Sequence, residues 1–251
     1  MSYVAGNKHM MISIVIPVHN EAGNIEQLAK EIENVLQSAP YNTEVLFVND
    51  ASTDNTGEIL KSLEKQYSFV TVHNMEERGG QTGCFQKAFQ EAKGKYIIRM
   101  DGDLQDNPLD LIQFFELLEQ DPDIIMGLRS VRKHRRILRV ATMIYDIVVV
   151  VLFDSPLYTN SSSFIAFKAK FLKGVQFEPN DHRYLSLIAM ERGAVKLKEV
   201  VVENRDRVYG QSKYGVYTKF IFSIFELLKV FIRLKSGHYN VQSQPLPKEI
   251  T

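Results

Sequence analysis

The feature that most constrains this fold is the alternation of short apolar runs and amphipathic segments through the first half of the chain. The apolar runs are rich in Ile and Val, which is typical of strands buried on both faces of a sheet. Apolar residues in the segments between them recur at helical spacing. The predicted strands are 11–18, 43–50, 69–74, 95–100 and 123–129, and the predicted helices are 22–38, 54–67, 80–93 and a fourth that begins near 107. This alternation predicts an α/β fold in which helices flank a mostly parallel sheet.

Three polar stretches follow predicted strands, at the positions where ligands bind to parallel sheets. HNEAGN follows the first strand, NDASTDNT follows the second and DGDLQD follows the fourth. We therefore expect the three stretches to converge on one edge of the sheet. Helix capping is the alternative explanation, and it would apply to Asn24, Ser52, Asp54 and Asn107. Capping explains any one of these residues, but it does not explain Asp101 and Asp103 in one turn near Asp50.

The carboxylates of Asp101 and Asp103, separated by Gly102, indicate a metal site. Two carboxylates at this spacing can point toward one position from a tight turn, and oxygen ligands suit a hard cation. We predict Mg²⁺ or Mn²⁺ as the cofactor, bound together with substrate phosphates, with the Gln105 amide oxygen as a further ligand. Residues 106–110 are expected to begin the next helix, where acidic side chains are common. The sequence contains neither a P-loop nor a GxGxxG motif, which argues against ATPases and NAD-dependent enzymes.

Composition excludes several other classes. Thirty basic and thirty acidic residues give a formal net charge of zero, which argues against a nucleic-acid-binding protein. The single cysteine, Cys84, excludes an intrachain disulfide and a cysteine zinc cluster, and it fits a reducing compartment. The first residues lack the apolar core of a signal peptide, and no apolar run reaches the roughly 18–20 residues of a membrane span. We therefore expect a cytoplasmic protein.

Three motifs, in this order along the chain, resemble those of family-2 glycosyltransferases: Pro17–Glu21 (PVHNE), Val48–Thr56 (VNDASTDNT) and Asp101–Gln105 (DGDLQ). The stretch DGDLQDNP is similar in particular to dolichyl-phosphate mannose synthases and related bacterial polyprenyl-phosphate glycosyltransferases. The resemblance covers residues 11–129, and RVYGQSK at 207–213 resembles a further motif of that branch. It implies a GT-A fold, a nucleotide-diphosphate sugar donor and inversion at the anomeric carbon.

The resemblance also implies roles for individual residues. The nucleotide-sugar site would be lined by Pro17, Val18, Asn20, Glu21, Asp50, Asp101 and Gly102, with Asp50 at the base. The divalent ion would be held by Asp101, Asp103 and Gln105. Asp103 would also be a catalytic residue, because the ion that it holds neutralises the leaving diphosphate. Phosphate or acceptor groups would meet Arg207, Ser212 and Lys213.

Two segments depart from the pattern of that branch. A D-x-T-S-G-F motif aligns with residues 158–164 (YTNSSSF), where Thr159 or Asn160 replaces the Asp and Ser163 replaces the Gly. This difference bears on the acceptor side of the reaction. Ala51 replaces a Gly that is frequent in the second motif, and we expect that change to be mild.

Residues 129–139 (RSVRKHRRILR) form a strongly basic stretch without a single acid. One interpretation is a solvated helix face. The other is an anion site for the donor diphosphate, an acceptor phosphate or anionic lipid headgroups. Arg129 is the best single candidate for such a site, because it lies at the end of a predicted strand.

Two unusually apolar segments, 140–153 and 216–235, lie in the second half of the chain. In the second, a narrow polar stripe recurs at helical spacing, at Lys219, Ser223, Glu226, Lys229 and Arg233. Such a helix is either buried, against the sheet or in a homodimer, or it lies in a membrane interface. We predict a transferase domain over 1–214, an amphipathic helix over 215–238 and a flexible tail over 239–251. The expected location is the inner face of a membrane, reached directly or through a membrane-protein partner.

The acceptor determines whether the reaction needs a general base. A polyprenyl phosphate is already ionised, whereas a sugar hydroxyl needs a base. Asp181 precedes a predicted helix and is the candidate base, with a simple helix cap as the alternative; His182 and Arg183 could instead meet a phosphate. We predict sugar transfer from a nucleotide-diphosphate sugar to a polyprenyl phosphate or a lipid-linked glycan. The alternatives are transfer to a hydroxyl of a soluble glycan or protein, a catalytically silent binding subunit and a nucleotidyltransferase.

Overall fold

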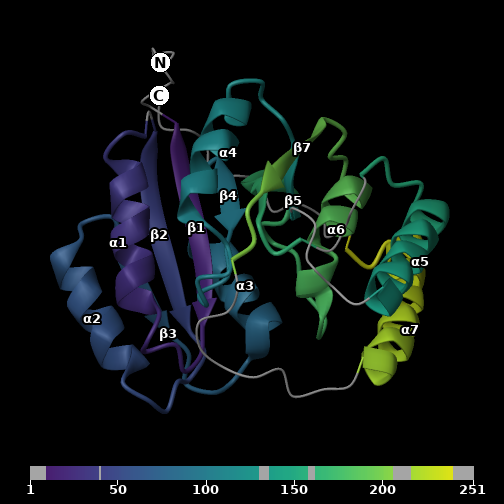
Figure 1. The fold of residues 1–251 in the computed structure, drawn as a ribbon. Helices are drawn as coiled ribbons and strands as arrows, with labels where there is room; N and C mark the ends of the chain where they lie inside the picture. The colour runs from purple at the N-terminus through teal and green to yellow at the C-terminus, as the bar shows by residue number, and fades with distance from the viewer. Residues whose placement is uncertain (1–9, 40, 130–135, 158–161, 206–215, 240–251) are drawn as a thin grey trace.

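A single twisted sheet forms the centre of the molecule in the computed structural model, which describes residues 10–39, 41–129, 136–157, 162–205 and 216–239 (Figure 1). Within these residues, seven strands lie in the order β3-β2-β1-β4-β6-β5-β7. Their bounds are β1 Met11–Val18, β2 Asn42–Asn49, β3 Val70–Asn74, β4 Tyr96–Arg99, β5 Ile124–Arg129, β6 Ile165–Lys168 and β7 Leu197–Val202. All neighbouring pairs are parallel except the two that include β6. The predicted fold class, a mostly parallel sheet flanked by helices, is confirmed.

Helices connect the strands and cover both faces of the sheet. The α-helices are α1 Ile25–Leu36, α2 Thr56–Gln66, α3 Gly80–Glu91, α4 Leu111–Leu118, α5 Arg136–Phe153, α6 Leu185–Glu191 and α7 Val216–Lys235. Short 3-10 helices are η1 Pro108–Asp110, η2 Ala169–Phe171 and η3 Asp181–Arg183. The fourth predicted helix corresponds to η1 followed directly by α4.

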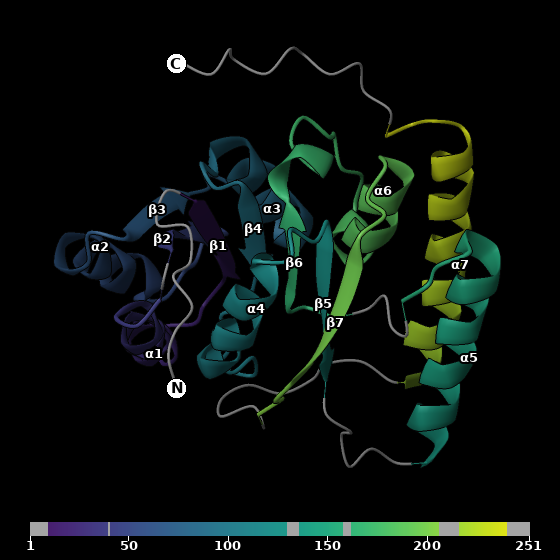
Figure 2. The same ribbon diagram turned by 90° about the horizontal axis from the view of Figure 1, so that it is seen from above.

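Two apolar clusters form the core, one on each face of the sheet. Ile14 and Phe47 pack with buried residues of α1, α2 and α4 on one face. Val15 and Leu46 pack with buried residues of α3, α6 and α7 on the other. Adjacent residues of one strand enter different clusters because side chains alternate across a sheet. Figure 2 shows these layers from above, with α1 and α4 on one side of the sheet and α3 on the other.

The first five strands lie where the sequence predicts them, with their ends displaced by at most one residue. Sequence patterns did not identify β6 and β7. β6 has only four residues, and most side chains of β7 are exposed or half-buried. Neither strand therefore contains the long apolar run that marks the parallel strands in the middle of the sheet.

One side of helix α7 is buried in the core and the other is exposed. The structure therefore shows features of both predictions for this segment, burial against the sheet and an exposed apolar face. Leu227, Val230 and Leu234 are buried in the core. The predicted polar stripe is partly directed inward, since Arg233 forms an ion pair with the fully buried Asp181. The helix also packs beside α5, where the rings of Phe153 and Phe231 lie 5.5 Å apart.

The outward sides of α5 and α7 form an apolar surface. We call it the α5–α7 apolar surface, and its exposed residues are Met143, Ile144, Ile147, Val150, Val151, Phe225, Leu228 and Ile232. Exposed apolar groups in such number, on two adjacent helices, are characteristic of a contact surface. In the part of the chain that the structure describes, no helix is long and apolar enough to cross a membrane.

Candidate active site

Hydrogen bonds join the loop after β1 to the loop after β2. The Asn20 side-chain oxygen accepts from the Thr53 backbone at 2.8 Å, and the Asn20 backbone donates to Ser52 Oγ at 3.0 Å. The Glu21 backbone donates to Thr56 Oγ1 at 2.9 Å. The two polar stretches that follow neighbouring strands thus form one unit at the carboxyl edge of the sheet, as their sequence positions predicted.

Each of the three strand-end loops contains a non-glycine residue in the left-handed region. These residues are Asn20 with φ 56°, Ala51 with φ 48° and Leu104 with φ 62°. An alanine has a steric cost in this conformation, whereas glycine has none. The replacement of a frequent glycine by Ala51 therefore carries a local cost, and left-handed residues of this kind concentrate at functional sites.

The turn at Asp101–Asp103 lies directly against the end of β1. A Cβ atom added to Gly102 would lie 2.7 Å from Val18 Cγ1 and 3.2 Å from the Pro17 carbonyl oxygen. Glycine is therefore required at position 102 by close packing. Asp103 is buried, and its Oδ1 accepts a hydrogen bond from the Gln105 backbone at 3.2 Å. The predicted nucleotide-site residues Pro17 and Val18 of β1 and the Asp101–Asp103 turn are therefore brought together.

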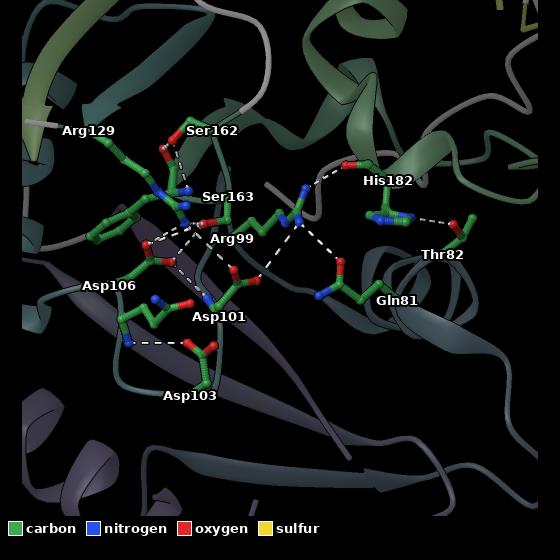
Figure 3. A network of polar contacts seen from close by, with 12 residues as sticks. Gln81, Thr82, Arg99, Asp101, Asp103, Asp106, Arg129, Ser162, Ser163 and His182 are labelled. Carbon is green, nitrogen blue, oxygen red and sulfur yellow. Dashed lines mark hydrogen bonds and ion pairs between the residues drawn. The ribbon is translucent and has the colours of Figure 1, made fainter. Parts of the chain in front are cut away.

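Two arginines flank the carboxylate of Asp101 (Figure 3). Arg99 Nη2 lies 3.9 Å from Oδ1, and Arg129 Nη2 lies 3.8 Å from Oδ2. Arg129 ends β5, as predicted, and it also donates to Ser163 Oγ. Arg99 ends β4 and did not emerge from sequence reasoning, although a charged residue at the end of an apolar strand is a usable signal.

Asp106 belongs to this cluster, which corrects its assignment to the start of the next helix. The helical segment begins only at Pro108, and the Asn107 side chain caps it by accepting from the Leu109 backbone. The buried Asp106 carboxylate accepts hydrogen bonds from the Asp101 backbone at 3.0 Å and from Arg129 at 3.3 Å. Burial, and then the charge of Asp101, raise the pKa of Asp106 to about 6, while Arg129 opposes this increase.

Asp50 lies at the N-terminus of α3. Its carboxylate accepts hydrogen bonds from the backbone of Gly79 at 2.7 Å and of Gly80 at 3.1 Å, and Arg78 lies 3.7 Å away. Asp50 therefore anchors the glycine-containing turn before α3 to the end of β2. Its predicted contact with a nucleotide base remains a prediction.

The position of Asp181 differs from that of an exposed general base. Its carboxylate is fully buried, accepts hydrogen bonds from Tyr239 Oη and the Glu178 backbone at 2.8 Å, and pairs with Arg233 at 2.9 Å. It begins η3 rather than capping a longer helix. Burial raises the pKa of Asp181 above its ordinary value.

His182 faces a cavity between η3 and the first turn of α3. The cavity, of about 330 Å³, is lined by Gly79, Gly80, Gln81, Thr82, Gly83, Phe177, Pro179, Asn180 and His182. His182 Nδ1 and Thr82 Oγ1 are hydrogen-bonded at 2.8 Å. Burial, followed by the charges of Arg99 and Arg183, lowers the pKa of His182 to about 3, so the imidazole is neutral at physiological pH.

Some predicted site residues lie outside the described part of the chain. These are Arg207, Ser212 and Lys213, together with Thr159 and Asn160 of the aligned acceptor segment and most of the basic stretch after Arg129. Ser163 of that segment is described, and its hydroxyl donates to Asp106 at 3.2 Å. The roles of the residues outside the described part of the chain remain predictions.

The oxygen ligands at the turn fit a divalent cation. Asp101 Oδ1 is buried and accepts no hydrogen bond from the residues that the structure describes. Among the same residues, no group of three or more His, Cys, Asp or Glu side chains could hold a metal. A cation at Asp101 and Asp103 would therefore complete its coordination with substrate phosphates and water, as Mg²⁺ commonly does.

The sheet order and the loops at its carboxyl edge together define an α/β fold of the GT-A type. The sequence model of the family described as "Glycosyl transferase family 2" matches residues 13–175, which is well over half of the chain. The chain therefore belongs to glycosyl transferase family 2, and the predicted family and enzyme class are confirmed.

Two curated relatives are named for lipid-phosphate acceptors. The chain is 28% identical over 236 residues to a dodecaprenyl-phosphate galacturonate synthase of Rhizobium johnstonii, covering 91% of this chain and 70% of that protein. It is 29% identical over 234 residues to a dolichol-phosphate mannosyltransferase of Pyrococcus furiosus, covering 90% of this chain and 64% of that protein. Both relatives are thus longer than the part that this chain matches.

Solved structures share the fold at low sequence identity. Mannosyl-3-phosphoglycerate synthase of Rubrobacter xylanophilus has a TM-score of 0.68 at 13% identity, covering 95% of this chain and 78% of that chain. Glucosyl-3-phosphoglycerate synthase of Mycobacterium tuberculosis, solved with Mn²⁺, uridine diphosphate and glucosyl-3-phosphoglycerate, has a TM-score of 0.66 at 15% identity, covering 94% of this chain and 82% of that chain. These likenesses confirm the predicted GT-A architecture.

The neutral His182 predicts a specific pH dependence of stability. Below its ordinary pKa of 6.5 the unfolded chain binds a proton that the folded chain does not, so folding is destabilised as pH falls from 6.5 toward 3. This contribution is about 2 kcal/mol between pH 6.5 and about pH 5. His182→Gln should lose less stability than wild type over this range, as measured by urea unfolding. His73→Gln, at a half-buried position on β3, controls for the substitution, and parallel curves for wild type and His182→Gln would contradict the expectation.

Proposed function

We propose that the protein is an inverting, metal-dependent transferase that moves a sugar from a nucleotide-diphosphate sugar to a polyprenyl phosphate or a lipid-linked glycan. The observation that carries this proposal is the turn at the end of β4, which contains the carboxylates of Asp101 and the buried Asp103 and in which Asp101 lies beside Arg99 and Arg129. Carboxylates that can hold a cation, next to guanidinium groups that can face phosphate oxygens, suit a diphosphate donor. The names of the two curated relatives, which contain a polyprenyl phosphate and a sugar, support the same acceptor chemistry.

Mg²⁺ or Mn²⁺ would be held by Asp103, with Asp101 and Gln105 as further oxygen ligands. When bound, such an ion neutralises charge on the departing diphosphate. Pro17, Val18, Asn20 and Glu21 would line the nucleotide side of the same edge, and Asp50 would meet the base. Gly102 allows this turn to approach β1, since a side chain there would collide with Val18.

The proposed reaction joins an oxygen of the acceptor phosphate to the anomeric carbon of the donor. The bond between that carbon and the diphosphate oxygen breaks, and the nucleoside diphosphate leaves with the bonding electron pair. A phosphate acceptor carries its negative charge before the reaction, so no proton has to be removed. Arg129 lies beside Asp101 with a quarter of its side chain exposed, and in this proposal it meets a phosphate oxygen of the donor or acceptor.

The burial of Asp181 favours a phosphate acceptor over a hydroxyl acceptor. A general base must reach the proton that it removes, but this carboxylate is enclosed by Tyr239, Glu178 and Arg233. A hydroxyl acceptor with Asp181 as base is the second candidate, and it would require this network to open.

The α5–α7 apolar surface supports peripheral attachment to the membrane that carries a lipid acceptor. Amphipathic helices bind membrane interfaces through apolar residues together with flanking basic groups. The exposed Lys229 and Lys235 on α7 provide such groups beside Phe225, Leu228 and Ile232. Attachment at the inner membrane face is the location proposed here. A second copy of the chain and a membrane-protein partner are the competing occupants of this surface.

Loss of the Asp103 carboxylate should abolish metal-dependent turnover. We expect Asp103→Asn to reduce turnover of a nucleotide sugar with Mn²⁺ by at least about 100-fold, because stabilisation of the leaving diphosphate is lost. Release of nucleoside diphosphate measures this rate, with Glu116→Gln, an exposed acid on α4, as the matched control. Wild-type turnover in Asp103→Asn would exclude this residue from the metal site.

Substitution of Asp181 should separate the two acceptor classes. For a phosphate acceptor, we expect Asp181→Asn to retain kcat/KM within about 10-fold and to lower stability by about 3–5 kcal/mol, because Arg233 loses its buried partner. Tyr239→Phe removes a hydrogen bond of the same network and leaves the carboxylate in place. A loss of several orders of magnitude in the folded Asp181→Asn protein, without a similar loss in Tyr239→Phe, would favour a hydroxyl acceptor.

Charged substitutions on the α5–α7 apolar surface should release the protein from lipid. We expect the wild-type chain to float with vesicles that contain anionic phospholipid, and Ile147→Glu with Ile232→Glu to remain in the soluble fraction. Leu109→Glu, at an exposed apolar residue of η1, is the matched control. If the wild type does not float and elutes as a dimer, the surface serves a second copy instead.

A further inference from the structure

Arg99 is a buried cation at the centre of the site. It is the last residue of β4, between β1 and β6, and its side chain is only 7% exposed. Burial of a charge is costly unless the charge is paired and hydrogen-bonded. Its Nε has no hydrogen-bond partner in the described residues, so only its two terminal nitrogens make polar contacts there. A residue with this cost requires an explanation beyond core packing.

The contacts of Arg99 join three separate segments (Figure 3). Nη1 donates to the His182 carbonyl oxygen at 2.5 Å, and Nη2 lies 3.4 Å from Gln81 Oε1 and 3.9 Å from Asp101 Oδ1. The guanidinium also lies over the Phe85 ring, 4.6 Å from its centre. One side chain thus connects the turn after β4, the first half of α3 and η3.

Two of these partners, Gln81 and His182, line the cavity of about 330 Å³ beside α3. The third, Asp101, belongs to the proposed metal turn. The planar fork of a guanidinium can donate to a carbonyl and face a carboxylate at once, which the single ammonium of lysine cannot do in the same geometry. Arg99 therefore connects the cavity wall to the turn that contains Asp101, because one guanidinium contacts both.

We propose that Arg99 is a positioning residue that holds η3 and the Asp101–Asp103 turn in one arrangement, so that the cavity and the metal turn act as a single site. This inference rests on the proposed function. It assigns to Arg99 a role that acts through Asp101 and η3 and not through contact with the substrate. Its charge has a second effect. Because Arg99 lies near Asp101, it opposes binding of a free cation and favours a cation that arrives with an anionic diphosphate.

The charge and the shape of Arg99 can be tested separately. Arg99→Met removes the charge and the fork, whereas Arg99→Lys restores the charge alone. Lys168→Met is the matched control, since Lys168 is a buried cation paired with Asp121 and Asp123 near the far end of β6. Mn²⁺ binding to the full chain is measured by electron paramagnetic resonance, and backbone protection of residues 180–184 by hydrogen exchange.

We expect Arg99→Met to lower kcat by at least about 30-fold, to speed exchange at residues 180–184 and to bind free Mn²⁺ about 3- to 30-fold more tightly. Arg99→Lys should return Mn²⁺ affinity to the wild-type value but leave exchange fast. Lys168→Met should change neither Mn²⁺ affinity nor the exchange of this segment. A role in stability alone would lower the unfolding temperature without this division between the two arginine variants.

Wild-type exchange at residues 180–184 in Arg99→Met, or weaker Mn²⁺ binding in that variant, would overturn the proposal. Both readouts are independent of turnover. If the wild-type chain shows no turnover with any nucleotide sugar, the proposed function fails, while exchange and Mn²⁺ binding still decide the role of Arg99.

Discussion

The parallel pairing of β1 with both β2 and β4 is the constraint on which the site depends. Val18 is in register with Asn49, and Val15 with Arg99, so three strands end close to one another at the same edge. The loops that follow them are then held together by short hydrogen bonds, and Gly102 allows the third to lie against β1. Any change in this register would separate the carboxylates from the nucleotide-side loops.

Charge balance explains the arrangement of the polar groups at this edge. The half-buried Asp101 lies beside both Arg99 and Arg129, and the buried Asp106 is paired with Arg129, so the two guanidinium groups balance the charge of the two carboxylates. The fully buried Asp181 is compensated by Arg233 of α7 in the same way. A hydrogen bond from Arg99 to the His182 carbonyl therefore connects the sheet edge to η3, and an ion pair connects η3 to the helix that carries the apolar surface.

Sequence patterns predicted the central strands and the convergence of their loops, because both follow from local periodicity and from the geometry of parallel sheets. They did not reveal β7, whose half-exposed side chains resemble those of a loop, or the position of Asp106, which reads equally well as a helix-start acid. The surroundings of Asp181 depend on Arg233 and Tyr239, more than fifty residues away along the chain. Long-range pairs of this kind leave no trace in local spacing.

The left-handed residues Asn20, Ala51 and Leu104 have a consequence for protein engineering. Glycine at Asn20 would lose the hydrogen bond to the Thr53 backbone, and glycine at Leu104 would lose a buried apolar side chain. Glycine at Ala51 would relieve steric strain, so its loop offers a stabilising substitution at the one place where mobility is least acceptable. The same glycine would widen the range of loop conformations, so the site at the carboxyl edge of the sheet would be less well ordered. Selection for thermal stability alone would therefore tend to raise the unfolding temperature of this enzyme at the expense of a fixed loop conformation at the site.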